Sequence, residues 1–235
     1  MRAFSIQSLM RQPCRLCHAP TLPGRSLCQQ CQDALPHLEH ACPCCALPLD
    51  ERTPPGSLCG ECLADPPAFD RARVPFRYRE PLNHLVSRFK YHRGLSDGRL
   101  LGELLAEHTA ATRVSVDLLL PMPLHPARLR GRGFNQAAEL ARVVSPACGI
   151  PWRSNLLTRQ KQGASQREAD RKTRLRNVRS AFRCQARDLP SRVAIIDDVI
   201  TTGATARAAA ACLKKAGVDW VEIWAVARTP RPGDT

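Results

Sequence analysis

The 235-residue sequence has few aromatic residues, no long apolar run and far fewer acidic than basic residues. Phenylalanine, tryptophan and tyrosine make up 5% of the chain. This argues against a surface of stacked rings, the usual platform for single-stranded nucleic acid. No apolar run approaches the roughly 20 residues that a membrane-spanning helix requires, so we expect no membrane insertion. The first residues contain no apolar core of a secretory signal, and we therefore expect a cytoplasmic protein.

The charge balance favours a partner with negative charge. The formal net charge is +14, from 35 lysine and arginine residues against 21 aspartate and glutamate residues. Residues 152–192 alone contain 12 basic residues against three acidic ones. Such a local excess suits a nucleic-acid backbone or a small phosphorylated ligand. A solvated basic face would have the same composition, so the charge alone does not choose between them.

The chain contains 12 cysteines, and in a reducing compartment paired cysteines are more often metal ligands than disulfides. Eight of them form four Cys-x-x-Cys pairs separated by 10, 10 and 13 residues. Two such pairs complete a tetrahedral site of four thiolates, so the spacing predicts two structural zinc sites. The predicted ligands are Cys14, Cys17, Cys28, Cys31, Cys42, Cys45, Cys59 and Cys62.

The pairing of these ligands is open at this point. Sequential pairing, with the first four cysteines on one metal and the last four on the other, gives a double zinc ribbon and is favoured. Interleaved pairing would give a cross-braced module. Cys44 could replace Cys45 in the second site. His37 or His40 could also compete as a ligand.

Composition changes near residues 64–70, where the cysteine-rich part gives way to alternating strand and helix patterns. The sequence therefore predicts a cysteine-rich double zinc ribbon at residues 1–68 and an α/β domain at residues 69–235. Strands are expected at 74–78, 116–122, 193–196 and 220–228, and helices at 81–91, 97–113, 134–149 and 203–217. This alternation favours a mainly parallel sheet flanked by helices.

The segment VAIIDDVITTGAT (193–205) combines a buried strand, two acids and a helix start. Residues at the carboxyl edge of a parallel sheet face the ligand crevice, where Asp197 and Asp198 could accept hydrogen bonds from ribose hydroxyls. The amide groups of residues 201–205 converge at the start of a helix, which favours a phosphate. A diol beside a phosphate is typical of a ribose 5-phosphate group, so the segment predicts a site for that group.

The stretch IIDDVITTGAT resembles the signature of type I phosphoribosyltransferases that binds phosphoribosyl pyrophosphate (PRPP). The resemblance implies the type I phosphoribosyltransferase fold, with Mg²⁺ bound together with PRPP. It implies that Asp197 and Asp198 hold the ribose and act as the catalytic pair by stabilising positive charge. The 5-phosphate would then be held by Thr201, Thr202, Gly203, Ala204 and Thr205.

A second stretch, LLLPMPLHPARLRGRGFNQAAELA (118–141), resembles a signature of the ComF/GntX family. The resemblance implies a loop that binds pyrophosphate, formed by Pro123, Leu124, His125 and Arg128. Weaker ligand candidates are Lys90, Arg132 and Asn135. The basic segment resembles the mobile hood of these proteins at Gln166, Arg174 and Asn177. The sequence departs from the family pattern after Gln166, where Arg167 stands in place of an aliphatic residue.

The resemblance implies a protein that binds PRPP and transfers its phosphoribosyl group with release of pyrophosphate, and it links the chain to DNA uptake. Two other hypotheses stay open. The chain could be a non-catalytic module that handles single-stranded DNA through its basic surface and zinc ribbons. It could also sense PRPP and transmit the signal to a protein partner through the ribbons. The sequence identifies neither an acceptor substrate nor an oligomeric state.

Overall fold

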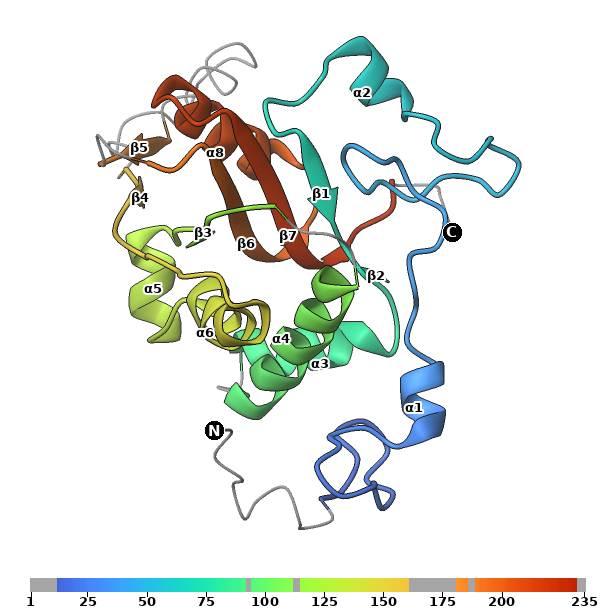
Figure 1. Cartoon of the computed structure of the whole chain (residues 1–235). Coiled ribbons are helices and arrows are strands. Elements are labelled where there is room, and N and C mark those ends of the chain that lie inside the picture. Colours follow the sequence, from blue (N-terminus) through green and yellow to red (C-terminus); the bar gives the residue numbers. More distant parts are fainter. Residues whose placement is uncertain (1–11, 92–93, 112–114, 161–180, 186–188, 232–235) are drawn as a thin grey trace, which may run out of the picture.

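The computed structural model describes residues 12–91, 94–111, 115–160, 181–185 and 189–231. Its centre is a sheet in the order β1–β7–β6–β3, with the short strand β2 also paired to β7 (Figure 1). The strands of this sheet are β1 Arg71–Arg73, β2 Phe76–Arg77, β3 Leu118–Pro121, β6 Arg192–Ile200 and β7 Trp220–Arg228. All pairings among them are parallel, which confirms the predicted α/β class.

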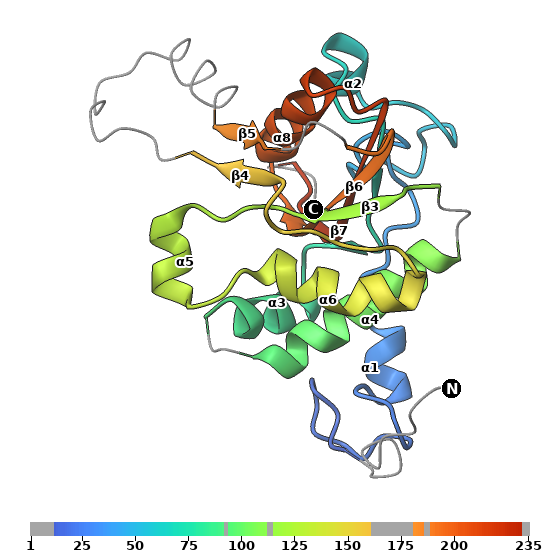
Figure 2. The same cartoon turned by 60° about the vertical axis from the view of Figure 1, so that its left-hand side comes forward.

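Helices cover both faces of the sheet (Figure 2). One face packs against α3 (Leu82–Tyr91), α4 (Leu95–Ala110) and α6 (Gln136–Cys148), and the other packs against α8 (Ala204–Lys215). The remaining elements are the short helices α1 Gln29–Asp33, α2 Gly60–Ala64 and α5 Pro126–Arg132, and the antiparallel pair β4 Leu157–Arg159 and β5 Phe182–Cys184. No helix in the described ranges is both long and apolar enough to cross a membrane.

The central strand β6 is buried on both faces and supplies the two halves of the core alternately. Val193 and Ile195 belong to the apolar cluster that contains α8. Ala194 and Ile196 belong to the cluster that contains α3, α4 and α6. This follows from the strand geometry, because successive side chains point to opposite faces of the sheet. A continuous apolar run is therefore what this strand requires.

Two glycines allow α4 to pack closely against its neighbouring helices. A Cβ atom on Gly98 would lie 2.3 Å from the ring of Phe89 on α3. A Cβ atom on Gly102 would lie 2.8 Å from the Cβ atom of Val143 on α6. Since real Cβ contacts are longer than this, larger residues at either position would push the helices apart.

Three of the four strand predictions had inaccurate bounds, and the strand expected at 116–122 is the shorter β3. Of the strand expected at 74–78 only β2 forms, and β1 lies before that range. Between them Pro75 has no N–H to donate, and its carbonyl accepts from the Leu38 amide at 2.8 Å. The strand expected to end at Ile196 continues to Ile200, because β7 pairs with it along its whole length. On the other side, β3 stops opposite Ile196.

The two cysteine-rich segments lie at different ends of the molecule (Figure 1). The first, residues 14–31, lies with α1 beyond the helices α3 and α4. The second, residues 42–62, lies with α2 beside β1, where the Ala72 amide donates to the Cys44 carbonyl at 2.7 Å. Each segment therefore packs against the α/β part, and the boundary between residues 68 and 69 stays a prediction.

Candidate functional site

The structure groups the eight predicted metal ligands into two clusters, and the favoured sequential pairing is confirmed. Within each cluster the four Sγ atoms lie within 4.8 Å of one another. The first cluster consists of Cys14, Cys17, Cys28 and Cys31, and the second of Cys42, Cys45, Cys59 and Cys62. Among the described residues, the possible competitors Cys44, His37 and His40 belong to neither cluster. The Nε2 atom of His40 instead lies 2.8 Å from the Thr53 carbonyl oxygen.

The geometry of both clusters fits zinc. The Sγ atoms of Cys17 and Cys28 are 3.6 Å apart, and those of Cys45 and Cys59 are also 3.6 Å apart. Four sulfur ligands at about 2.3 Å in a tetrahedron would be about 3.8 Å from each other. Burial raises the pKa of the Cys45 thiol to about 12, and a bound metal would offset this by favouring the thiolate. Four-thiolate sites leave no open position and are structural.

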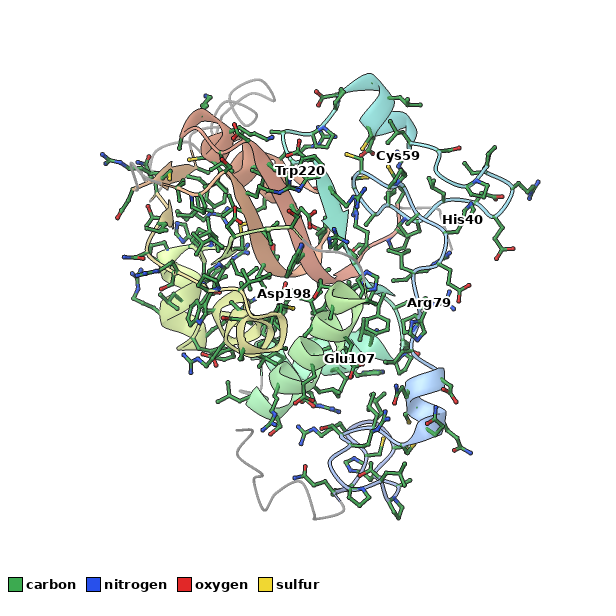
Figure 3. The ribbon with its side chains drawn as sticks, in the orientation of Figure 1. His40, Cys59, Arg79, Glu107, Asp198 and Trp220 are labelled. Carbon is green, nitrogen blue, oxygen red and sulfur yellow. The ribbon has the colours of Figure 1, made fainter. Side chains whose placement is uncertain are left out.

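The paired aspartates lie at the carboxyl end of the sheet, beyond the last residue of β3. Asp198 is 8% exposed and its Oδ1 atom is 3.2 Å from the Nζ atom of Lys90, at the end of α3. The Asp198 amide donates to Asp197 Oδ1 at 2.8 Å. Figure 3 shows Asp198 at the opposite end of the sheet from Trp220, which begins β7. The structure thus brings together Lys90, a weaker ligand candidate, and the aspartate pair.

Asp197 is placed where its charge is costly. Burial and the negative charge of Asp198 raise the pKa of Asp197 to about 7, although the positive charges of Lys90 and Arg159 act in the opposite direction. A carboxyl group that is half ionised near neutral pH can gain its charge when a ligand arrives with hydroxyl donors or a cation.

The loop that follows β6 opens directly into α8. Gly203 precedes the helix with φ 76°, in the left-handed region that favours glycine. A Cβ atom there would meet nothing within 4 Å, so the space in front of the loop is open. Thr201 and Thr202 are exposed, and Thr202 Oγ1 accepts from the Ala204 amide at 3.4 Å. The start of this 12-residue helix therefore presents amide donors beside the aspartate pair.

The candidates for a pyrophosphate loop follow β3 at the same edge of the sheet. Pro123, Leu124 and His125 form the connection, and His125 Nδ1 accepts from the Ala127 amide at 3.2 Å to cap α5. Arg128 is exposed on α5. The expected loop thus continues into a helix from Pro126 onward, because proline is well suited to the first helical turn.

Two weaker candidates have structural partners. Asn135 caps α6 by accepting from the Ala137 amide at 3.0 Å, and its Nδ2 atom donates to the Met122 carbonyl at 3.1 Å. It thereby fixes the chain that follows β3. Arg132 donates to Gln136 at 3.0 Å and lies over the Tyr91 ring at 5.2 Å. The hood candidates Gln166, Arg174 and Asn177 lie outside the described residues.

Two arginines that the sequence did not single out lie beside these groups. Arg159 on β4 packs over the Phe182 ring at 5.6 Å. Its positive charge partly offsets the rise in the pKa of Asp197. Burial and the nearby charge of Arg128 lower the pKa of Arg159 itself. Arg228 is 3% exposed and lies at the end of β7 opposite Ile200. An arginine that ends a buried apolar strand was the available signal for Arg228, whereas nothing in the local pattern marks Arg159.

Comparisons with known proteins identify a similar domain and similar chains. A double zinc ribbon domain model matches residues 6–63. The DNA utilization protein YhgH of Salmonella typhi is 33% identical over 92% of this chain and 96% of the relative. Competence protein F of Haemophilus influenzae is 35% identical over 72% of this chain and 78% of the relative. Competence protein ComFC of Bacillus subtilis is 26% identical over 83% and 80%, respectively.

Two solved structures also resemble parts of the chain. Glutamine PRPP amidotransferase from B. subtilis, complexed with ADP and GMP, has a TM-score of 0.39 and 23% identity over 54% of this chain and 25% of that chain. Purine phosphoribosyltransferase from Pyrococcus horikoshii has a TM-score of 0.33 and 18% identity over 60% of this chain and 77% of that chain.

Proposed function

The chain belongs to the ComF/YhgH (GntX) family of competence and DNA utilization proteins, and we propose that it binds the ribose 5-phosphate part of PRPP and transfers the phosphoribosyl group with release of pyrophosphate. The observation that carries this proposal is the pair Asp197 and Asp198 next to an open helix start. The two carboxylates would accept hydrogen bonds from the ribose diol, and the loop that would bind the phosphate follows them directly in the chain. Both lie at the carboxyl edge of one parallel sheet.

The two carboxylates would hold the ribose. Asp198 is buried and oriented by Lys90 at 3.2 Å, so its position is fixed before a ligand arrives. Asp197 is oriented by the hydrogen bond that its Oδ1 accepts from the Asp198 amide. Each carboxylate keeps acceptor capacity for a hydroxyl group. Prepositioned acceptors lower the entropy that ligand binding costs.

The 5-phosphate would bind at the start of α8. Amide groups at a helix start are donors without helical partners, and the helix dipole favours an anion there. The left-handed Gly203 lets the backbone approach the phosphate closely, and the hydroxyl groups of Thr201, Thr202 and Thr205 supply further donors. This loop stands beside the aspartates, as a ribose 5-phosphate group requires.

The diphosphate would be bound by basic residues on the other side of the aspartates. The guanidinium group of Arg159 lies near Asp197 and that of Arg128 lies near Arg159, and guanidinium groups bind phosphate oxygens in a bidentate manner. Mg²⁺ would be held by diphosphate and ribose oxygens, since it prefers oxygen ligands and keeps much of its water. The nearby carboxylates of Asp197 and Asp198 are a donor set that suits such a hard cation.

Displacement at the ribose C1 atom passes through a state with positive charge on the ring. Carboxylates beneath the ring would stabilise this charge, and arginines would stabilise the departing diphosphate. Catalysis would therefore consist mainly of positioning and electrostatic stabilisation. Exposed Tyr91 follows Lys90 in the chain, and half-buried Arg132 lies over its ring, so both would be available to an incoming acceptor.

Calorimetric titration of PRPP with Mg²⁺ into the zinc-loaded protein tests this proposal. We expect the wild type to bind and Asp198→Asn to lose most of its affinity, because the neutral amide offers the ribose only one oxygen acceptor. Asp219→Asn is the matched control, since Asp219 is exposed at the opposite end of the sheet. Equal affinity of the wild type and Asp198→Asn would contradict the assignment. Screening nucleobases for pyrophosphate release then tests transfer.

A second candidate function is binding of single-stranded DNA. It is supported by the excess of basic residues and by the names of the relatives, which include a DNA utilization protein. Fluorescence anisotropy of a labelled oligonucleotide at increasing salt would test it, because a contact with several phosphates weakens steeply with salt. DNA binding that PRPP does not affect would separate this function from the sugar phosphate site.

A further inference from the structure

Arg228 connects the second cysteine cluster to the loop after β6. Its Nε atom donates to the Cys45 carbonyl at 3.3 Å, and its Nη1 atom donates to the Ile200 carbonyl at 3.2 Å. Nη1 also donates to the Thr201 carbonyl and to the Thr229 carbonyl. The guanidinium group thus touches a predicted zinc ligand on one side and the first residue of the candidate phosphate loop on the other.

A second contact joins the same two parts of the molecule. Arg207, in the first turns of α8, donates to the Asp65 carbonyl at 2.8 Å and lies 3.2 Å from Asp65 Oδ2. Asp65 follows α2, which carries Cys62. The apolar side chains of Ile200 and Ala206 belong to the same core cluster as the cysteines of the second site. The loop is therefore attached to the second cluster at its beginning and at its end.

The contacts of Arg228 are difficult to replace. The side chain is 3% exposed, so the carbonyl groups that it satisfies have little water to bond instead. A planar guanidinium group reaches acceptors on both of its sides at once, which the single ammonium group of lysine cannot do. The position of the Cys45 carbonyl in turn depends on how the metal holds this Cys-x-x-Cys turn.

We propose that Arg228 is a positioning residue through which the metal at the second cluster holds the loop of residues 201–205 in the conformation that binds phosphate. That this loop binds phosphate rests on the proposed function, whereas the coupling between the second cluster and the loop does not. The first cluster has no such role, because none of the hydrogen bonds of the described residues joins it to the loop.

Hydrogen exchange of the zinc-loaded, full-length protein tests the coupling without a ligand. In Arg228→Lys we expect the amides of residues 201–206 to exchange about tenfold faster, since at least one hydrogen bond from a charged donor is lost. Exchange in α3 and α4 should stay as in the wild type. A chelator should also remove zinc faster from the second cluster of this variant.

Arg73→Lys is the matched control. Arg73 is also a buried arginine of the same sheet, but its Nε atom pairs with Glu222 at 2.6 Å, at a distance from the loop. This variant should leave exchange in residues 201–206 relatively unchanged even if the protein is less stable. Unchanged exchange in Arg228→Lys would overturn the proposal. So would an equal increase along the whole chain, or the same local increase in both variants.

PRPP affinity separates this inference from the proposed function. If the wild type binds PRPP, Arg228→Lys should bind it about tenfold more weakly, because part of the binding energy must then order the loop. If the wild type does not bind PRPP, the proposed function fails, and the exchange data alone decide on the coupling. Full PRPP affinity in a variant with a loosened loop would overturn the positioning role.

Discussion

Each of the two cysteine clusters has four cysteine ligands with similar spacing, but the two clusters are built into the molecule in different ways. All four cysteines of the second cluster are buried, and they share an apolar core with α8 and the central strands. In the first cluster only Cys14 is buried and Cys17 is exposed. The second cluster is therefore part of the interior of the α/β domain, whereas the first is an outlying module.

The first cluster is attached by an ion-pair network as well as by the apolar contacts of Cys14, Leu27 and Leu35 with the core beneath α3 and α4. Asp97, which is 1% exposed, binds Arg15 Nε at 2.9 Å and Arg88 Nε at 3.0 Å. The second Arg88 nitrogen, Nη2, also donates to the Arg15 carbonyl at 2.6 Å. Lys90, which pairs with Asp198, lies two residues after Arg88 on the same helix. One motif thus serves as a core element in one place and as a tethered module in the other.

The largest effect should come from removing one metal ligand from each cluster. We expect Cys59→Ser to prevent stable folding of the α/β domain, because a structural zinc contributes on the order of 10 kcal/mol and a domain is stable by only about 5–15 kcal/mol. Cys17→Ser should leave a cooperative unfolding transition of the sheet. Circular dichroism with zinc quantification checks this. Similar loss of structure in both variants would end the distinction between the clusters.

Asp97→Asn should release the first cluster from the α/β domain. Two arginines would lose their buried carboxylate, and because their side chains are 33% and 37% exposed we expect a cost below the about 3–5 kcal/mol of a fully buried pair. Limited proteolysis should then cut within residues 12–35 while the sheet remains protected. Arg99→Gln is a suitable control, because Arg99 pairs with Glu103 on the exposed side of α4. A proteolysis pattern like that of the wild type would show that apolar contacts alone hold the module.

The same carboxylate predicts a response to acid. Burial alone would raise the pKa of Asp97, but the hydrogen bonds and charges of Arg88 and Arg15 outweigh it and lower this pKa. An acid with a lowered pKa in the folded state stabilises the fold above its unfolded pKa of about 3.9, and this stability is lost as the pH falls through the lower folded value. Asp97→Asn should therefore be less sensitive to acid than the wild type below about pH 4.

Zinc release should distinguish the clusters kinetically. The exposed first cluster can open locally, whereas the second requires opening of the core, so we expect two phases that differ by about tenfold or more in rate. A colorimetric chelator added to the zinc-loaded protein would record them. Cys17→Ser should remove the fast phase and keep the slow one. A single phase that accounts for both metals would contradict the difference in burial.

The ligand affinity of the site that contains Asp197 should depend on pH in a way that the first cluster does not affect. Since the pKa of Asp197 is raised to about 7, its carboxyl group is largely neutral below that value and accepts hydroxyl groups less well. Affinity for ribose 5-phosphate should therefore fall by up to about tenfold per pH unit below pH 7. Calorimetry at several pH values should give the same profile for the wild type and Cys17→Ser. A flat profile would mean that Asp197 does not accept from the ligand.

Short-range patterns predicted much of this molecule. The zinc clusters follow from the spacing of the Cys-x-x-Cys pairs, and the strand at 220–228 has the bounds of β7. The aspartate pair and the loop after it are contiguous in the sequence, so their proximity needed no knowledge of the fold. The extension of β6 to Ile200 could not be predicted in this way, because it depends on pairing with β7.

The parts that the sequence did not predict depend on contacts between distant segments. Asp97 meets Arg15, 82 residues earlier in the chain, and Arg228 meets Cys45, 183 residues earlier. Arg159 acts on Asp197 from a different sheet. A pattern of apolar and charged residues specifies which side chains are buried, but it does not specify which buried charges become partners.

The most direct test of the central claim is hydrogen exchange with and without ribose 5-phosphate, the simplest ligand that fits the proposed site. We expect slower exchange of the amides of residues 203–206, at the start of α8, and no change in the outlying first cluster. The protection should be absent in Asp198→Asn at the same ligand concentration. Protection elsewhere, or unchanged exchange at the start of α8 under saturating ligand, would contradict the account.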